Sequence, residues 1–137
     1  MATYDEVSIG QSASVSKTIS ETDIYLFAGI TGDFNPAHVD AVSAADGMFK
    51  QRIAHGMLTA SFISTVIAMQ LPGPGTIYAG QDLQFRAPVF IGDTITARVE
   101  VSEKLEQRKW LKLKTTVTNQ DGKLVVDGTA TVIPPSA

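Results

Sequence analysis

The segment that most constrains the fold is the apolar run from Met57 to Leu71, which begins MLTASFISTVIAM. Apolar residues fall on nearly every side of a helix drawn through residues 57–69, which predicts a helix surrounded by other structure. The Pro-Gly-Pro-Gly run at residues 72–75 ends this helix. Because a bilayer span requires about 20 apolar residues, we expect a core helix and no membrane segment.

Beyond residue 76, apolar and polar residues alternate, which is the period of strands with one buried face. Residues 119–122, Asn-Gln-Asp-Gly, are typical of a hairpin turn between two such strands. The predicted inward positions are Ile95, Ala97, Val99 and Val101, then Leu111, Leu113, Thr115 and Val117, and after the turn Leu124, Val126, Gly128, Ala130 and Val132.

One helix that is apolar all round and four or five long antiparallel strands predict an α+β domain in which a curved sheet wraps around the helix. This is the hot-dog architecture. An ordinary α+β sandwich, with helices on one sheet face, is the alternative. We expect residues 1–137 to form one domain, with residues 1–6 and 134–137 as loose ends. Such a sheet leaves an edge strand and apolar surface uncovered, which predicts a homodimer.

Two shorter helices are predicted before the apolar run. Ser20 and Asp23 resemble a capping box at the start of a helix that contains Ile24, Phe27, Ala28 and Ile30 and ends at Gly32. Asp40 caps a second helix, Ala41 to Asp46, which Gly47 terminates.

The composition excludes several classes of function. The chain has no cysteine, so disulfides, thiolate nucleophiles and cysteine-based metal sites are excluded. A net charge of −3 offers no basic excess for nucleic acid, which we do not expect as a partner. Two histidines without cysteine do not match usual metal-ligand spacing, so we expect no metal. The first residues do not look like a signal peptide, which favours the cytoplasm.

The stretch Gly-Asp-Phe-Asn-Pro-Ala-His at residues 32–38 carries an acid and an imidazole five residues apart. Asp33 and His38 could together hold a water molecule, one accepting and one donating a proton. Pro36 stiffens the chain between them and favours an extended conformation at Asn35. On spacing alone an alternative stays open, in which Asp33 caps a turn and His38 begins a helix.

Further candidates lie at the apolar helix. Gly56 falls at its expected N-terminus, where free N–H groups and the helix dipole could receive a developing oxyanion. The alternative is a glycine that caps the helix or permits close packing, and His55 beside it could be a packing or hydrogen-bonding residue. Ser64 lies within the helix, where most serines only bond the carbonyl four residues back.

These motifs resemble those of the MaoC-like (R)-specific enoyl-CoA hydratases, also called the hydratase 2 family. The resemblance covers roughly residues 7–133, and length and motif order look most like the short bacterial enzymes that supply polyhydroxyalkanoate synthesis. It rests on FAGITGDFNPAH at residues 27–38, IAHGML at 53–58, YAGQDLQF at 78–85, Pro88-Val89 and Gly92-Asp93.

The resemblance implies a homodimeric hydro-lyase that adds water reversibly to trans-2-enoyl-CoA. It implies that Asp33 and His38 are the catalytic pair, that the Gly56 N–H holds the thioester oxygen, and that Asn35 and Ser64 support the site. No cofactor is implied, because CoA is part of the substrate. The alternatives are a 3-hydroxyacyl-[acyl-carrier-protein] dehydratase, a hot-dog thioesterase and an acyl-binding module.

Overall fold

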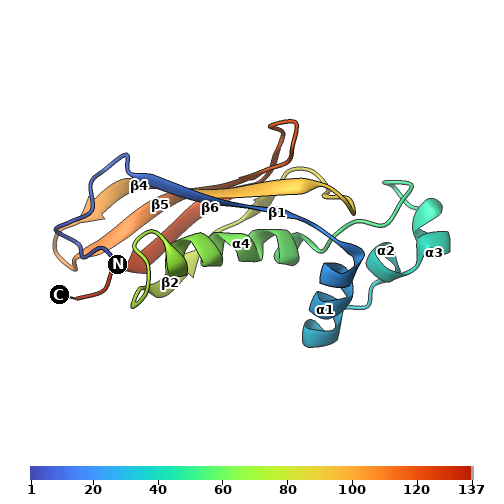
Figure 1. The fold of residues 1–137 in the computed structure, drawn as a ribbon, viewed down its shortest axis with the longest axis horizontal. Coiled ribbons are helices and arrows are strands. Elements are labelled where there is room, and N and C mark those ends of the chain that lie inside the picture. Colours follow the sequence, from blue (N-terminus) through green and yellow to red (C-terminus); the bar gives the residue numbers. More distant parts are fainter. Residues whose placement is uncertain (137) are drawn as a thin grey trace.

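The computed structural model describes residues 1–136 as one twisted antiparallel sheet with a long helix along one face (Figure 1). Hydrogen-bonded strands follow the order β1-β4-β5-β6-β2, and β3 pairs with β6. The strands are β1 (Ser12–Thr18), β2 (Ile77–Gln81), β3 (Gln84–Phe85), β4 (Thr94–Leu105), β5 (Trp110–Thr118) and β6 (Leu124–Ile133). The helices are α1 (Glu21–Thr31), α2 (Pro36–Val39), α3 (Ala41–Ala45) and α4 (Gly56–Met69).

The arrangement of the helices confirms the predicted hot-dog architecture. The helix that lies along the sheet is α4, whereas α1, α2 and α3 lie beyond one end of the sheet (Figure 1). The alternative sandwich would have placed several helices across the sheet face. Within the described part of the chain, no helix has both the length and the apolar character needed to cross a bilayer.

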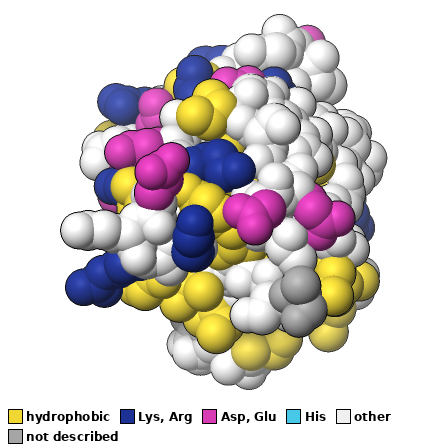
Figure 2. Space-filling view, turned by 90° about the vertical axis from the view of Figure 1, so that its left-hand side faces the viewer, with side chains coloured by type: hydrophobic (Ala, Val, Ile, Leu, Met, Phe, Trp, Pro, Cys, Tyr) yellow, Lys and Arg dark blue, Asp and Glu magenta, His cyan; other side chains and the backbone are white. Residues whose placement is uncertain are grey.

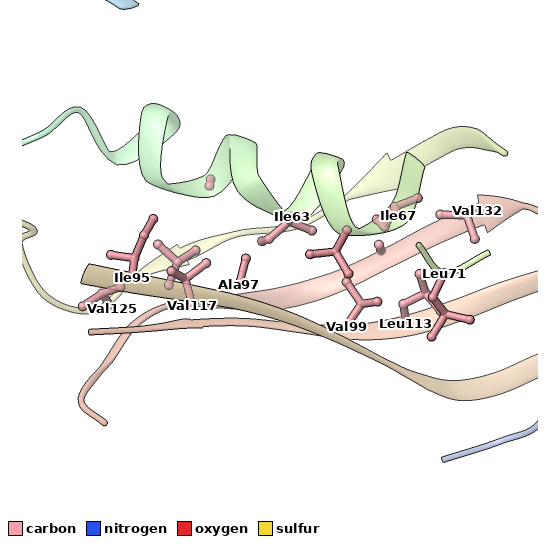
Figure 3. Packing of buried hydrophobic residues seen from close by; sticks show 14 of the residues in the cluster. Ile63, Ile67, Leu71, Ile95, Ala97, Val99, Leu113, Val117, Val125 and Val132 are labelled. Carbon is pink, nitrogen blue, oxygen red and sulfur yellow. The ribbon is translucent and has the colours of Figure 1, made fainter. Parts of the chain in front are cut away.

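The core lies between α4 and the inner faces of the long strands. Ile63 and Ile67 point from α4 toward the sheet, where they meet the inward side chains of β4, β5 and β6 (Figure 3). The predicted alternation is confirmed on β4 and β5, because all eight inward positions are fully buried. Burial of these aliphatic side chains is the main force that holds the helix on the sheet.

The expectation that α4 is surrounded on all sides is wrong for the chain described. The sheet covers one face of the helix, and the opposite face is exposed, with Met57 at 55% and Met69 at 67%. Small uncharged residues occupy the rest of this face, so the sequence pattern does not distinguish it from a buried one. The exposed residues are Met57, Ser61, Ser64, Thr65, Ala68 and Met69.

Two strands differ from the predicted pattern. Leu124 was expected to face inward but is exposed, because the register of β5 and β6 shifts by one residue beside it and buries Val125 instead. Strand β1 was not predicted, since its sequence SASVSKT shows little apolar alternation. It pairs with β4 at the edge of the sheet, where hydroxyl pairs such as Ser16 with Thr96 (2.7 Å) support it.

The first residues, expected to be loose, contact the body of the protein. The amide of Ala2 donates to the Pro72 carbonyl at 2.7 Å, and Tyr4 is buried beneath the ammonium group of Lys104. At the other terminus Pro134 and Pro135 are buried as well, and residue 137 lies outside the described residues. Figure 2 shows the end of the molecule where the termini lie, with cationic and anionic side chains interspersed.

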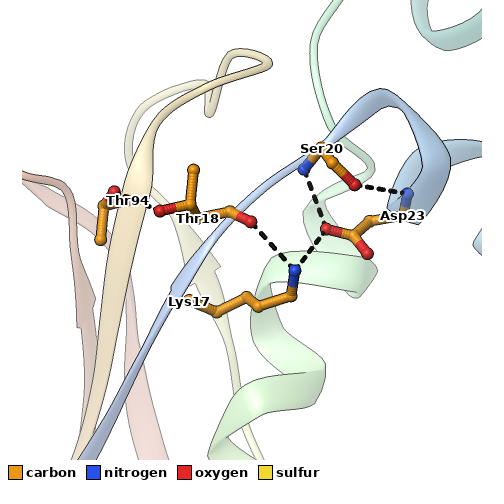
Figure 4. Close-up of polar contacts among 5 residues, drawn as sticks. All are labelled: Lys17, Thr18, Ser20, Asp23 and Thr94. Carbon is orange, nitrogen blue, oxygen red and sulfur yellow. Dashed lines mark hydrogen bonds and ion pairs between the residues drawn. The ribbon is translucent and has the colours of Figure 1, made fainter.

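The predicted capping box at the start of α1 is confirmed. The Asp23 amide donates to Ser20 Oγ at 3.1 Å, and the Ser20 amide donates to Asp23 Oδ2 at 2.8 Å (Figure 4). Lys17 also forms an ion pair with this carboxylate at 2.9 Å. The hydrogen bond from the Ser20 amide, with help from Lys17, lowers the pKa of Asp23. Helix α1 therefore begins where the sequence predicts.

We expect the contribution of Asp23 to the free energy of unfolding to depend on pH. The pKa of Asp23 is lower in the folded protein than in the unfolded chain, so its stabilisation is present above the unfolded value of about 3.9 and is lost as pH falls. Asp23→Asn should lower the free energy of unfolding by about 1 kcal/mol at pH 7, the difference between a charge-assisted and a neutral hydrogen bond. Urea denaturation at pH 7 and pH 3 measures this difference.

Because the stabilisation is lost as pH falls through the lowered folded-state pKa of Asp23, the difference between the variant and the wild type should be smaller at pH 3 than at pH 7. Ser20→Ala serves as the control, because it removes the uncharged half of the capping box and should cost about 1 kcal/mol at both pH values. An Asp23→Asn effect of equal size at pH 7 and pH 3 would contradict the assignment.

Candidate active site

The bend that follows α1 is held by local hydrogen bonds. Gly32 ends the helix in a left-handed conformation, with a φ of 81° that a glycine adopts without strain. The Asn35 amide donates to Asp33 Oδ1 at 3.2 Å, and Asn35 Oδ1 accepts from the Ala37 amide at 3.0 Å. Pro36 stands in the first turn of α2. The bend is thus a stiff connector, as the sequence predicts.

His38 lies on α2 with one ring nitrogen already engaged. Its Nδ1 lies 2.8 Å from the carbonyl oxygen of Ile53, and a carbonyl oxygen can only accept. Nδ1 therefore carries the proton in the neutral ring, and Nε2 is left with a free lone pair. This tautomer makes Nε2 of His38 available to accept a proton from a bound molecule.

The segment from Arg52 to His55 anchors this histidine to the rest of the fold. The Ile53 amide donates to the Ala37 carbonyl at 3.1 Å, and the Ala54 amide donates to the Val89 carbonyl at 2.7 Å. Arg52 reaches back to α1, where it pairs with Glu21 at 2.7 Å. Hydrogen bonds from the Tyr25 hydroxyl and from Arg52 lower the pKa of Glu21, which keeps this carboxylate charged. The segment ties α1 and α2 to the connection between β3 and β4.

Asp33, His38 and His55 come together at the bend. One potential ligand atom of each lies within 4.8 Å of the others. The two imidazole rings are stacked, with centroids 3.9 Å apart and planes 27° from parallel. Lone pairs of ring nitrogens lie in the ring planes, so stacked rings do not direct them to one common ion. The geometry suits the exchange of a proton with a shared water better than a metal centre.

A cavity of about 470 Å³ opens beside this cluster at the N-terminus of α4. No side chain caps the first turn of α4 within residues 1–136, so its backbone N–H groups are free to meet a ligand. Gly56 lies at this point, and a Cβ atom there would be 2.7 Å from the Phe85 ring. The residues that line the cavity include Asp33, His38, His55, Gly56, Thr59 and Phe85.

The position of Gly56 bears on two of the interpretations that the sequence left open, and its role as an oxyanion donor stays a prediction. Gly56 permits close approach of Phe85, and it places an amide-rich helix terminus in the same cavity as Asp33 and His38. The positive end of the helix dipole favours negative charge at this position. The three residues predicted to do the chemistry thus line one cavity.

Ser64 lies elsewhere. It lines a second groove of about 390 Å³, between the exposed face of α4 and β2, and it is absent from the lining of the first cavity. Met57 borders both spaces. Beside the groove, Tyr78 donates its hydroxyl hydrogen to Gln81, and partial desolvation of this side chain raises the Tyr78 pKa to about 12. A supporting role for Ser64 stays a prediction.

Sequence reasoning underestimated three residues of the cavity. His55 was considered only a packing or hydrogen-bonding residue, and Thr59 and Phe85 were not singled out. Thr59 is buried, and its hydroxyl has no hydrogen-bond partner within the described chain. Phe85 is on the short strand β3, which carries too few residues for a clear alternating pattern. Only the tertiary fold brings these residues to the helix terminus.

The fold and cavity place the protein among hot-dog proteins that present an acid and an imidazole at the start of the central helix. The MaoC like domain matches residues 6–123. An (R)-specific enoyl-CoA hydratase from Rhodospirillum rubrum is 53% identical to this protein over 97% of this chain and 92% of its own. The chain therefore belongs to the MaoC-like family.

Solved structures agree with this family assignment. The R-hydratase PhaJ1 from Pseudomonas aeruginosa superimposes with a TM-score of 0.93 at 49% identity, covering 98% of this chain and 86% of that one. The (R)-hydratase from Aeromonas caviae, which is involved in PHA biosynthesis, gives a TM-score of 0.92 at 43% identity. That match covers 94% of this chain and 98% of the other.

Proposed function

We propose that the protein is an (R)-specific enoyl-CoA hydratase, a hydro-lyase that adds water reversibly to trans-2-enoyl-CoA and yields (R)-3-hydroxyacyl-CoA. Relatives of that activity are 53% and 44% identical over most of the chain. The observation that carries the proposal is the meeting of Asp33 and His38 in one cavity with the amide-rich terminus of α4. Neither a metal nor a redox group is required by this reaction.

In the proposed mechanism, Asp33 and His38 orient one water molecule. The water oxygen forms a bond to Cβ of the enoyl group, one water proton passes to the pair, and a proton is returned to Cα from the same face. His38 Nε2 has the free lone pair for the accepting role. Asp33 and His38 can share the proton, so we assign the acid and base roles to the pair.

Negative charge collects on the thioester oxygen while the C–O bond forms. The Gly56 N–H, at the positive end of α4, is the proposed donor to this enolate oxygen. A donor of this kind typically lowers the barrier by about 3 kcal/mol, because its dipole is fixed before the charge develops. Asn35 then serves the reaction indirectly, since it holds the bend that carries Asp33.

Supply of (R)-3-hydroxyacyl-CoA to polyhydroxyalkanoate synthesis is the proposed role, in keeping with the Aeromonas caviae protein. A cytoplasmic location stays a prediction. The second candidate activity, dehydration of 3-hydroxyacyl groups on acyl carrier protein, uses the same chemistry with another carrier. Comparing crotonyl-CoA with crotonyl-[acyl-carrier-protein] as substrates separates the two.

We expect Asp33→Asn and His38→Gln each to lower kcat/KM for crotonyl-CoA by about 10² to 10⁴, because each removes a group that moves a proton. Loss of the conjugated enoyl absorbance measures the reaction. Asp40→Asn is the matched control: Asp40 only caps α3, a role that asparagine also fills, and activity should be unchanged.

Circular dichroism should show that all three variants stay folded. Release of free CoA thiol in place of enoyl bleaching would favour a thioesterase. Full activity of the Asp33→Asn variant would contradict the assignment of Asp33 and His38 as the catalytic pair.

We also propose that the protein is a homodimer that joins through β2. The two sheet edges differ in character: β1 is rich in serine and carries Lys17, whereas β2 exposes Ile77 and Tyr78. Polar and lysine-rich edges resist pairing, and an apolar edge invites it. The exposed face of α4 borders the same groove as β2, so a second copy on this side would cover both.

Sedimentation should therefore give twice the 14.6 kDa chain mass. Ile77→Lys places a charge on the apolar edge and should shift the protein to a monomer. Ser14→Lys on the opposite edge is the control and should leave the dimer intact. A monomeric wild type, or dissociation by the Ser14 variant alone, would contradict this interface.

A further inference from the structure

His55 is a buried histidine that has no role in the proposed mechanism. It is 2% exposed, lines the cavity and immediately precedes Gly56 at the start of α4. Its own carbonyl accepts the Thr59 amide at 3.2 Å, which is the first hydrogen bond of that helix. A polar side chain buried at this point has to be paired to offset its lost hydration.

The hydrogen bonds fix the tautomer of His55. Nε2 lies 2.9 Å from the backbone carbonyl oxygen of Asp33, which can only accept, so Nε2 carries the proton. Nδ1 is buried and has no hydrogen-bond partner within residues 1–136. A second proton on Nδ1 would bury an unpaired charge against the neighbouring His38 ring. In the neutral ring, the single N–H of His55 points at the Asp33 backbone.

The faces of the His55 ring are in contact as well. His38 stacks on the ring at a centroid distance of 3.9 Å, and Phe27 of α1 approaches it at 4.9 Å with planes 54° apart. These contacts restrict the rotation of the His55 ring, and the stack in turn restricts His38. One side chain thus touches both proposed catalytic residues, by a hydrogen bond on one side and by stacking on the other.

We propose that His55 is a positioning residue for the hydration reaction, an inference that rests on the proposed function. Its Nε2–H holds the main chain of Asp33 while its ring face holds the plane of His38. The acid and the imidazole consequently keep their relative position when His38 gains and loses a proton. His55 itself transfers no proton in this scheme, because Nε2–H is committed to a backbone carbonyl.

Three substitutions separate the hydrogen bond from the stack. In His55→Gln the side-chain amide can place an N–H where Nε2 stands, whereas in His55→Asn the amide reaches only the position of Nδ1. Both lack the ring, so their difference reports the hydrogen bond to Asp33. In His55→Phe the ring against His38 and Phe27 is kept and the donor is lost. Steady-state kinetics on crotonyl-CoA gives kcat and KM for each variant.

We expect His55→Asn and His55→Phe to lower kcat about 100-fold, the scale on which a misplacement of about 1 Å acts, with KM changed less than about threefold. His55→Gln should recover kcat to within about tenfold of the wild type. A purely structural role predicts lower stability with no difference between glutamine and asparagine. Equal kcat for those two variants, or wild-type kcat for His55→Phe, would overturn the proposal.

Long-range ¹H–¹⁵N correlation spectra of the wild type give a test that needs no variant to fold. The expected result at pH 7 is an Nε2–H tautomer for His55 and an Nδ1–H tautomer for His38. An Nδ1–H tautomer or a doubly protonated ring at His55 would also overturn the proposal. A wild type that does not hydrate crotonyl-CoA would instead count against the proposed function, since the tautomers are independent of activity.

Discussion

The candidate site depends on the contacts of one short segment, Ile53 to His55, with the bend that carries Asp33. The Ile53 carbonyl accepts from His38, the Ile53 amide donates to Ala37, and His55 donates to the carbonyl of Asp33. The Ala54 amide bonds the Val89 carbonyl and so fixes the segment to the body of the domain. Residues 32–36 are exposed, so without these bonds nothing would fix the position of the bend relative to the start of α4.

The core that supports this segment was largely predictable from sequence. The period-two alternation located β4 and β5, and the Ser20–Asp23 box and Gly32 gave both ends of α1, because these signals act through neighbouring residues. Strand β1 was missed, since an edge strand with a polar sequence has no buried face to reveal it. The exposed face of α4 was also missed, because uncharged residues such as methionine, serine, threonine and alanine suit either a core or a contact surface.

The sequence predicts which residues form the site better than it predicts the contacts between them. Asp33 and His38 stand out because an acid and an imidazole flank a proline in one stretch, and Gly56 because it precedes an apolar helix. The contacts of His55 join residues far apart in sequence, and no local pattern encodes them. Ser64 has helical spacing from Gly56, yet it lines the other groove, because that position faces β2.

The central claim is that Asp33 and His38 face one water site opposite the Gly56 amide. A crystal structure with bound (R)-3-hydroxybutyryl-CoA tests it most directly. The predicted complex has the 3-hydroxyl oxygen within hydrogen-bond distance of both the Asp33 carboxylate and His38 Nε2, and the thioester oxygen on the Gly56 N–H. A 3-hydroxyl group that contacts neither side chain, or a thioester oxygen held away from the start of α4, would contradict it.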